Sequence, residues 1–249
     1  MELSGKTALV TGGTRGIGAA TALKLADLGA DVAILGRHNN DEAQSVLASI
    51  RKKGRNGIMI AADMAQPDDA VRAVNETVEA LGGIDVVIHN AGGNVPGSFT
   101  EVSDETWYEA FDVHIHAAFH LGRAAIPHMK RHGEGAIVLI SSVAGIRGCP
   151  NSAAYGVVKG ALTQMARAMA RDLADDNIRV NCVLPGIIWT AFHHAMPPDV
   201  RKNNLDNRVP LHRFGTPEQV AEVIALMVQN DFITGESFVV DGGMTMRIA

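Results

Sequence analysis

Two side chains four residues apart, Tyr155 and Lys159, form the pair in this sequence best suited to proton transfer. Residues at this spacing share one face of a helix, so the phenol and the ammonium group would lie together. A tyrosine ordinarily titrates near about 10, and a cation one turn away favours the phenolate and lowers that pKa toward the working range. Ser142 lies upstream, just past an apolar run, where its hydroxyl can face the same crevice. The alternative is plain packing beside a solvated charge, with the serine in an ordinary turn.

A glycine-rich turn near the N-terminus has the features of a phosphate-binding loop. The segment 11–18 reads TGGTRGIG and joins an apolar run to a helical pattern. Glycines let the backbone approach a pyrophosphate, and a helix N-terminus offers free N–H groups and a positive dipole. The spacing differs from the usual Gly-x-Gly-x-x-Gly, so a turn that binds nothing is the alternative. We expect a dinucleotide here.

The end of the second apolar run bears on which dinucleotide binds. NAD sites usually carry a carboxylate at that point, and NADP sites carry an arginine near the 2′-phosphate. The sequence reads Leu35-Gly36-Arg37, and Arg15 in the glycine loop adds a second cation. Because a planar guanidinium suits a phosphate, we predict NADP(H). NAD(H) is the alternative if Arg37 is only a solvated surface residue.

Three histidines, His114, His116 and His120, fall within seven residues. On a helix His114 and His116 point to nearly opposite sides. His116 and His120 could share a face, but we find no carboxylate or cysteine at ligand spacing beside them. We therefore predict no metal site and expect His116 and His120 to serve packing or subunit contact.

The elements that must position these residues can be predicted from the hydropathy pattern. Continuous runs rich in Val and Ile, typical of buried parallel strands, lie at 6–11, 31–35, 56–61, 84–89, 135–140, 178–184 and 236–240. Helical patterns lie between them at 16–28, 41–53, 67–81, 104–132, 152–175 and 217–229. This alternation predicts an α/β fold: a single Rossmann-like doubly wound parallel sheet of seven strands with helices on both faces. We expect one dinucleotide-binding domain over 1–249, with a substrate lid at about 187–216.

Composition narrows the class of protein. The 249 residues are 47% hydrophobic, enough for a sizeable core, and no apolar run reaches the length of a membrane span. The N-terminus lacks a signal-peptide layout, and two cysteines are too few for a disulfide framework. The net charge of −5 gives no support to nucleic-acid binding. We expect a cytoplasmic protein without nucleic-acid or membrane partners.

Taken together, these features resemble the short-chain dehydrogenase/reductase family, in its subfamily of about this length. The resemblance covers essentially the whole chain. It comprises Thr11-Gly12 with Gly16 and Gly18, Asp63, Asn90-Ala91-Gly92, Ser142, Tyr155 with Lys159, and Pro185-Gly186 followed by Thr190.

The resemblance implies an NAD(P)-dependent oxidoreductase that needs no metal. Tyr155 would be the general acid in carbonyl reduction and the base in alcohol oxidation, and Ser142 would hydrogen-bond the substrate oxygen. Lys159 would lower the pKa of Tyr155 and hold the ribose of the nicotinamide. The cofactor-binding set would be Gly12, Thr14, Arg15, Gly16, Ile17, Gly18, Arg37, Asp63, Met64, Asn90, Ala91, Gly92, Tyr155, Lys159, Pro185, Gly186, Ile188 and Thr190.

His114 departs from the family pattern. It stands where the family has an asparagine that helps hold a water beside the catalytic lysine. One interpretation is that the imidazole holds the same water and shuttles protons itself, since histidine titrates near neutral pH. A second is a weakened relay in a slow enzyme. The third is a catalytically silent nucleotide-binding protein that acts as a sensor or scaffold, against which the intact Ser142, Tyr155 and Lys159 argue.

Substrate and assembly are the least determined by the sequence. The segment 209–224 and the ending ITGESFVVDGGM resemble the 3-oxoacyl-carrier-protein reductases, and a basic lid would suit an acidic carrier protein. Such endings recur among polyol, sugar and alcohol dehydrogenases, so the expected substrate is a small carbonyl or alcohol, with a thioester-linked one as a special case. The central helices and the tail FVVDGGMTMRIA resemble family members that assemble, and we expect a homotetramer.

Overall fold

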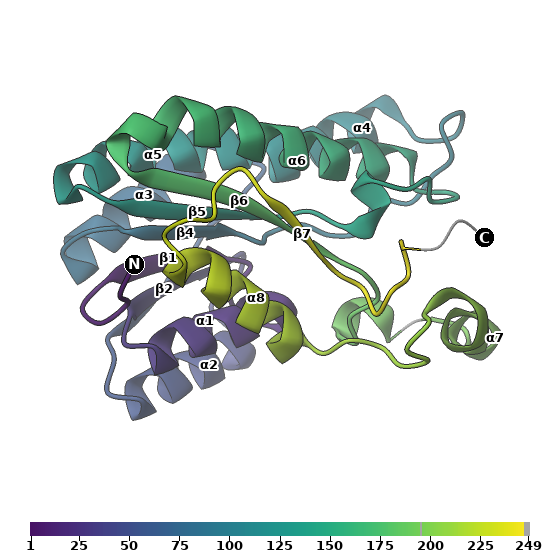
Figure 1. The fold of residues 1–249 in the computed structure, drawn as a ribbon, viewed down its shortest axis with the longest axis horizontal. Helices are drawn as coiled ribbons and strands as arrows, with labels where there is room; N and C mark the ends of the chain where they lie inside the picture. Colours follow the sequence, from purple (N-terminus) through teal and green to yellow (C-terminus); the bar gives the residue numbers. More distant parts are fainter. Residues whose placement is uncertain (195, 247–249) are drawn as a thin grey trace.

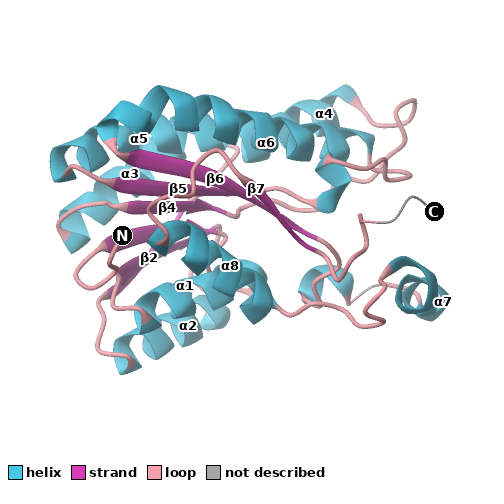
Figure 2. Ribbon diagram, viewed as in Figure 1, coloured by secondary structure: helices cyan, strands magenta, loops and turns pink. Residues whose placement is uncertain are grey.

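The predicted strands form and lie parallel in one sheet with the order β3-β2-β1-β4-β5-β6-β7. The structure is a computed structural model that describes residues 1–194 and 196–246. The strands are β1 (Thr7–Thr11), β2 (Asp31–Gly36), β3 (Gly57–Ala61), β4 (Val86–His89), β5 (Gly135–Ile140), β6 (Ile178–Pro185) and β7 (Ser237–Val240). The predicted fold class, a doubly wound parallel sheet, is confirmed (Figure 2).

Helices cover both faces of the sheet. The α-helices are α1 (Gly16–Asp27), α2 (Asp41–Lys52), α3 (Pro67–Leu81), α4 (Asp104–Phe111), α5 (Ala117–His132), α6 (Ala153–Leu173), α7 (Pro198–Asn203) and α8 (Pro217–Gln229). Helices α1, α2 and α8 lie on one face, and α3, α5 and α6 lie on the other (Figure 1). Within the described ranges, no helix combines the length and apolarity needed to cross a bilayer.

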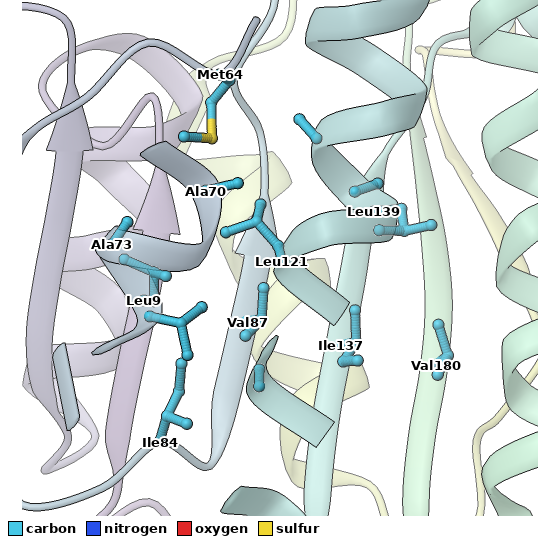
Figure 3. Packing of buried hydrophobic residues seen from close by; sticks show 14 of the residues in the cluster. Leu9, Met64, Ala70, Ala73, Ile84, Val87, Leu121, Ile137, Leu139 and Val180 are labelled. Carbon is cyan, nitrogen blue, oxygen red and sulfur yellow. The ribbon is translucent and has the colours of Figure 1, made fainter. Parts of the chain in front are cut away.

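The strands carry apolar side chains on both faces because each face packs against helices. Leu9, Val87 and Ile137 belong to the cluster under α3 and α5 (Figure 3), whereas the alternate residues Val10 and Val138 pack toward α1 and α8. Double coverage explains why the sequence shows continuous apolar runs rather than alternation. The chain order reverses between β1 and β4, and the crevice at their carboxyl ends is where such sheets bind ligands.

Two regions differ from the sequence-based expectation. The predicted helix over 104–132 is interrupted by a π-helical segment, Asp112–His116, between α4 and α5. The region 187–216, for which the sequence analysis predicts a lid and no regular element, contains the 3₁₀ turn Ala191–His193, helix α7 and a second π turn, Asn204–Arg208. A proline at the first turn of α7 favours a helix start that a hydropathy pattern does not reveal. Residue 195 of this region and residues 247–249 of the predicted assembly tail lie outside the described residues.

Candidate active site

The carboxyl ends of the central strands open into a cavity of roughly 1340 Å³. The cavity is lined by the predicted residues from the glycine loop, the strand ends and the catalytic helix: Gly12, Thr14, Arg15, Gly16, Ile17, Arg37, Asp63, Met64, Asn90, Ala91, Gly92, His114, Ser142, Tyr155, Lys159, Pro185, Gly186, Ile188 and Thr190. One space therefore brings together side chains that are far apart in the sequence. Gly18 is the member of the predicted set that does not line it.

Gly18 shapes the glycine loop from behind. A Cβ atom at this position would lie 2.1 Å from the carbonyl oxygen of Gly12, so only glycine permits the loop to fold this closely onto α1. The Asn90 side-chain amide donates to the carbonyl oxygens of Thr11 and Gly12 at 3.2 and 3.1 Å, which fixes the loop against β4. Arg15, the residue before α1, gives its first turn no side-chain cap. The free N–H groups of that turn fit the pyrophosphate of a dinucleotide.

The two predicted cations stand at one end of the cavity, which we call the adenosine end. Arg15 and Arg37 are exposed and line the cavity, and neither guanidinium has a carboxylate partner among residues 1–194 and 196–246. Asp63 lies nearby, with its carboxylate accepting the N–H of Ala65 at 3.0 Å. Two unpaired guanidinium groups at one rim fit the 2′-phosphate of NADP.

The opposite end of the cavity, the catalytic end, holds Ser142, Tyr155 and Lys159. Lys159 is 4% exposed, and its ammonium group lies 5.5 Å from the centroid of the Tyr155 ring, in agreement with the predicted helical spacing. It donates to the carbonyl oxygen of Ile140 at 2.8 Å. Burial lowers the pKa of Lys159 to about 8. Lys159 is therefore a cation held in apolar surroundings close to the phenol.

The expected lowering of the Tyr155 pKa is wrong for the protein as it stands. Burial is the largest influence and raises this pKa, while the hydroxyl of Ser142 acts in the opposite direction and lowers it. The sequence shows a cation one turn away but does not show how completely the helix packing removes water from the phenol. At neutral pH the Tyr155 hydroxyl is consequently protonated and ready to donate.

The predicted titration of His114 near neutral pH is also wrong. The side chain is 1% exposed, and burial, followed by the nearby charge of Lys159, lowers its pKa to about 2. Its ring centroid lies 6.2 Å from that of Tyr155, nearly edge-on at 82°. The Nδ1 atom is buried and has no hydrogen-bond partner among the described residues. His114 is thus a neutral imidazole with an unused polar atom beside the catalytic pair.

The other two histidines of the cluster lie away from this cavity. His116 is exposed, and its Nδ1 atom lies 2.7 Å from a carboxylate oxygen of Asp112, four residues earlier, so the expectation that no carboxylate stands at ligand spacing beside it is wrong. His120 packs beside Phe119, with ring centroids 5.3 Å apart. Over 1–194 and 196–246, no three His, Cys, Asp or Glu side chains gather as a metal site would require.

Two features, one behind the cavity wall and one in it, were not identified from the sequence. His89 is fully buried at the end of β4, where a polar residue closes the apolar run IDVVIH. Met244 and Thr245, in the predicted assembly tail, line the cavity because Asp241 accepts hydrogen bonds from the Thr245 backbone and hydroxyl, both at 2.7 Å. A polar residue at the end of a buried strand was the available signal for His89. The tail carried no comparable signal.

The region 187–216 is held by its own aromatic and charged groups. Trp189 stacks on Phe214 with ring centroids 5.3 Å apart and planes 7° from parallel. The Arg201 guanidinium lies 4.5 Å above the centroid of the Trp189 ring. Lys202 pairs with Asp206. Two cations of this region, Arg201 and Lys202, are therefore engaged by other residues of the same region.

Comparison with known proteins agrees with this arrangement. Residues 12–245 match the protein family described as "Enoyl-(Acyl carrier protein) reductase". The chain is 35% identical to Dehydrogenase/reductase SDR family member 4 of Caenorhabditis elegans, over 99% of this chain and 98% of the relative. It is 33% identical to the 3-oxoacyl-[acyl-carrier-protein] reductase FabG of Staphylococcus epidermidis, over 97% and 99%.

A solved structure shares the fold. The L-sorbose reductase of Gluconobacter frateurii, crystallised with NADPH and L-sorbose, superposes with a TM-score of 0.92 at 30% identity over the full length of both chains. The glycine loop, the strand order and the buried catalytic end thus occur together in a chain whose relatives are oxidoreductases. The protein belongs to the short-chain dehydrogenase/reductase family.

Proposed function

We propose that the protein is an NADP(H)-linked reductase of small carbonyl compounds, which also oxidises the corresponding secondary alcohols. The observation that carries the proposal is the convergence of Ser142, Tyr155 and Lys159 in one cavity with the uncapped N-terminus of α1. This arrangement can hold a dinucleotide and a carbonyl side by side. A Tyr155→Phe variant tests it: turnover should fall by roughly 10²–10⁴, whereas near-normal turnover would refute the mechanism.

The chemistry divides between the cofactor and three side chains. The nicotinamide supplies hydride in reduction and accepts it in oxidation. The protonated Tyr155 hydroxyl donates to the carbonyl oxygen, because burial raises its pKa and keeps it an acid at neutral pH. The Ser142 hydroxyl orients the same oxygen, and the Lys159 ammonium stabilises the phenolate that remains.

The preference for NADP(H) rests on the adenosine end. Arg15 and Arg37 offer two unpaired guanidinium groups there, and the similar L-sorbose reductase was crystallised with NADPH. NAD(H) is the alternative. Quenching titrations with NADPH and NADH decide between them, because the 2′-phosphate is their difference; tighter binding of NADH would contradict the preference.

A free small carbonyl is the substrate class that we favour over a carrier-linked thioester. The likeness to FabG supports a 3-oxoacyl thioester. However, Arg201 stacks on Trp189 and Lys202 pairs with Asp206, so these two cations of the proposed lid contact the lid's own residues instead of being free to pair with an acidic carrier. A panel of simple ketones, ketoses and acetoacetyl thioesters, assayed by loss of NADPH absorbance, would identify the class.

His114 is proposed to relay protons as a neutral group rather than by titration. A neutral imidazole accepts at one nitrogen and donates at the other. The unpartnered Nδ1 atom provides a place for a bridging water near Lys159, whose charge is felt at His114. His114→Asn should retain most of the activity and His114→Ala should lose it. Unchanged rate and pH profile in both variants would exclude the relay.

The second candidate function is a silent, nucleotide-binding sensor or scaffold. The histidine in place of the expected asparagine at position 114 is the observation that favours it. Turnover of any carbonyl that disappears in Tyr155→Phe would exclude it.

We also propose a homotetramer, supported by exposed apolar side chains on the outer helices, Tyr108, Phe119 and Val157. Light scattering should give a mass near four times 26.3 kDa.

A further inference from the structure

His89 lies behind the cavity wall and connects two segments, from different elements, that lead into residues lining the cavity. Its side chain is 1% exposed at the end of β4, directly beside Thr11 at the end of β1. The Nδ1 atom lies 3.2 Å from the Thr11 hydroxyl oxygen, and the Nε2 atom lies 3.1 Å from the backbone carbonyl oxygen of His114. One buried ring therefore contacts both the strand that leads into the glycine loop and the π segment between α4 and α5.

The surrounding hydrogen bonds assign the proton on the His89 ring. The Thr11 hydroxyl oxygen accepts the backbone N–H groups of Asn90 and Ala91 at 3.0 and 2.9 Å, which occupy its acceptor sites. The Thr11 hydroxyl must then donate, and His89 Nδ1 at 3.2 Å is nearer than the carbonyl of Ile88 at 3.5 Å. Nδ1 is thus the acceptor, and Nε2 carries the proton that is donated to His114.

The bond to His114 falls on the π segment, Asp112–His116. A π turn replaces the regular i→i−4 hydrogen bonds of the helix, and a side chain that donates to one of its carbonyl oxygens supplies a partner there. The π turn directs the His114 ring onto Gly92, where a Cβ atom would lie only 2.0 Å from the imidazole. His114 is therefore placed in contact with the cofactor groove on one side and with Tyr155 on the other.

We propose that His89 is a positioning residue that serves two separable purposes through its two nitrogens. Nε2 holds the π segment and so places His114 beside Tyr155, while Nδ1 holds Thr11 and, through it, the Asn90–Ala91 wall of the cofactor groove. The first contact governs turnover and the second governs cofactor affinity. This inference rests on the proposed reductase function only for its kinetic readout.

Two substitutions separate the nitrogens. In His89→Gln the side-chain amide nitrogen can reach the position of Nε2 and keep the bond to His114, but the acceptor facing Thr11 is lost. In His89→Asn the shorter side chain keeps an acceptor near Nδ1 and loses the bond to His114. The control is His132→Asn. His132 contacts the carboxylate of Asp85 at 2.8 Å, and Asp85 directly precedes β4, at the end of the strand that is opposite to His89.

The expected kinetics differ between the two variants. His89→Asn should lower kcat roughly tenfold to hundredfold, since a displacement of about 1 Å can have that effect, with little change in the Kd for NADPH. His89→Gln should weaken NADPH binding several-fold and leave kcat near that of the wild type. The His132→Asn control should alter Tm alone. Equal changes of kcat and Kd in the two His89 variants, or changes confined to Tm, would overturn the proposal.

A double-mutant cycle and a spectrum complete the test. In a His114→Ala background, His89→Asn should have little further effect on kcat, because both act through the same ring; a full additional loss would overturn the route through His114. Nitrogen-15 spectra of histidine-labelled protein should show the His114 resonances shifted in His89→Asn and unshifted in His89→Gln. The spectra require no turnover, so a protein without reductase activity would refute the proposed function and still test His89.

Discussion

At the adenosine end of the cleft, the cations Arg15 and Arg37 stand in solvent on loops, whereas at the catalytic end Lys159 and two histidines lie almost fully buried on regular elements. Exposed charges keep their ordinary hydration and act on a ligand through screened attraction. Buried ionisable groups lose hydration, and the neutral form is favoured unless a partner compensates. The exposed cations of the adenosine end therefore affect the stability of the fold little, whereas the buried ionisable groups of the catalytic end reduce it when they are charged.

This difference in burial corresponds to a difference in role: the adenosine end would recognise the cofactor, and the catalytic end would carry out the reaction. At the adenosine end, replacing Arg15 or Arg37 should change the stability of the fold little, because no buried hydrogen bond depends on either side chain. At the catalytic end, burial lowers the pKa of Lys159 to about 8 and that of His89 to about 4, so folding makes the charged form of each group less favourable than it is in the unfolded chain. Active sites commonly sacrifice stability in this way.

Removing the Lys159 charge should give the largest effect. In Lys159→Met we expect kcat to fall by at least about 10², while stability at pH 7 rises. The folded chain releases this proton near pH 8 and the unfolded chain only near 10.5, so below pH 8 the folded state holds an unfavourable charge worth about 3 kcal/mol. The lost bond to Ile140 offsets about 1 kcal/mol of the gain.

Urea unfolding of Lys159→Met and of the wild type at pH 7, together with kcat, measures both effects. Lys130→Met is the control, because Lys130 is half-exposed and pairs with Asp176 at 2.7 Å. That control should leave kcat unchanged and give no gain in stability. Equal destabilisation of both variants would show that burial of Lys159 is not unfavourable.

Acid should destabilise the catalytic end through its histidines. The unfolded chain binds protons at His89 and His114 below about pH 6.5, whereas the folded chain binds them only near 4 and 2. Stability is therefore lost as the pH falls from 6.5 toward 4, by up to about 1.4 kcal/mol per pH unit for each histidine. Unfolding free energies at pH 7, 6 and 5 should show a shallower slope in His114→Asn. A slope equal to that of the wild type would mean that folding does not lower the pKa of His114.

At the exposed adenosine end we predict a smaller effect, which weakens the binding of NADPH and not that of NADH. Arg37→Ala should weaken NADPH binding about tenfold, which corresponds to 1.4 kcal/mol, and leave NADH binding nearly unchanged. The weakening of NADPH binding should become smaller as salt is added, because the charges of Arg37 and of the 2′-phosphate are both solvated and salt screens their attraction. Fluorescence titration at two ionic strengths measures it, with Arg51→Ala on the far part of α2 as the control. Equal weakening of NADPH and NADH would place Arg37 away from the 2′-phosphate.

The same division explains what could be predicted from the sequence. The strands, the glycine loop and the Tyr155–Lys159 pair depend on local periodicity and spacing, and the structure places them as expected. The π segment receives a contact from His89, 25 residues away in the chain, which no local pattern encodes. The pKa values of Tyr155 and His114 depend on how completely helices exclude water, and the sequence alone does not give that packing.

The proposed lid provides an intermediate case and the smallest prediction. Arg201 is exposed like Arg37, yet it lies on the Trp189–Phe214 stack rather than free in solvent. A cation over an exposed ring contributes about 0.5–1 kcal/mol, so Arg201→Met should raise the substrate KM two- to fivefold and leave kcat within about twofold. Because Trp189 is in direct contact, its fluorescence should shift in Arg201→Met and not in the control Lys202→Met, whose charge pairs with Asp206. If both variants raise KM equally, the lid recognises its substrate by net charge. Arg201 would then act as Arg15 and Arg37 do at the adenosine end, through the attraction of an exposed charge and not through its contact with Trp189.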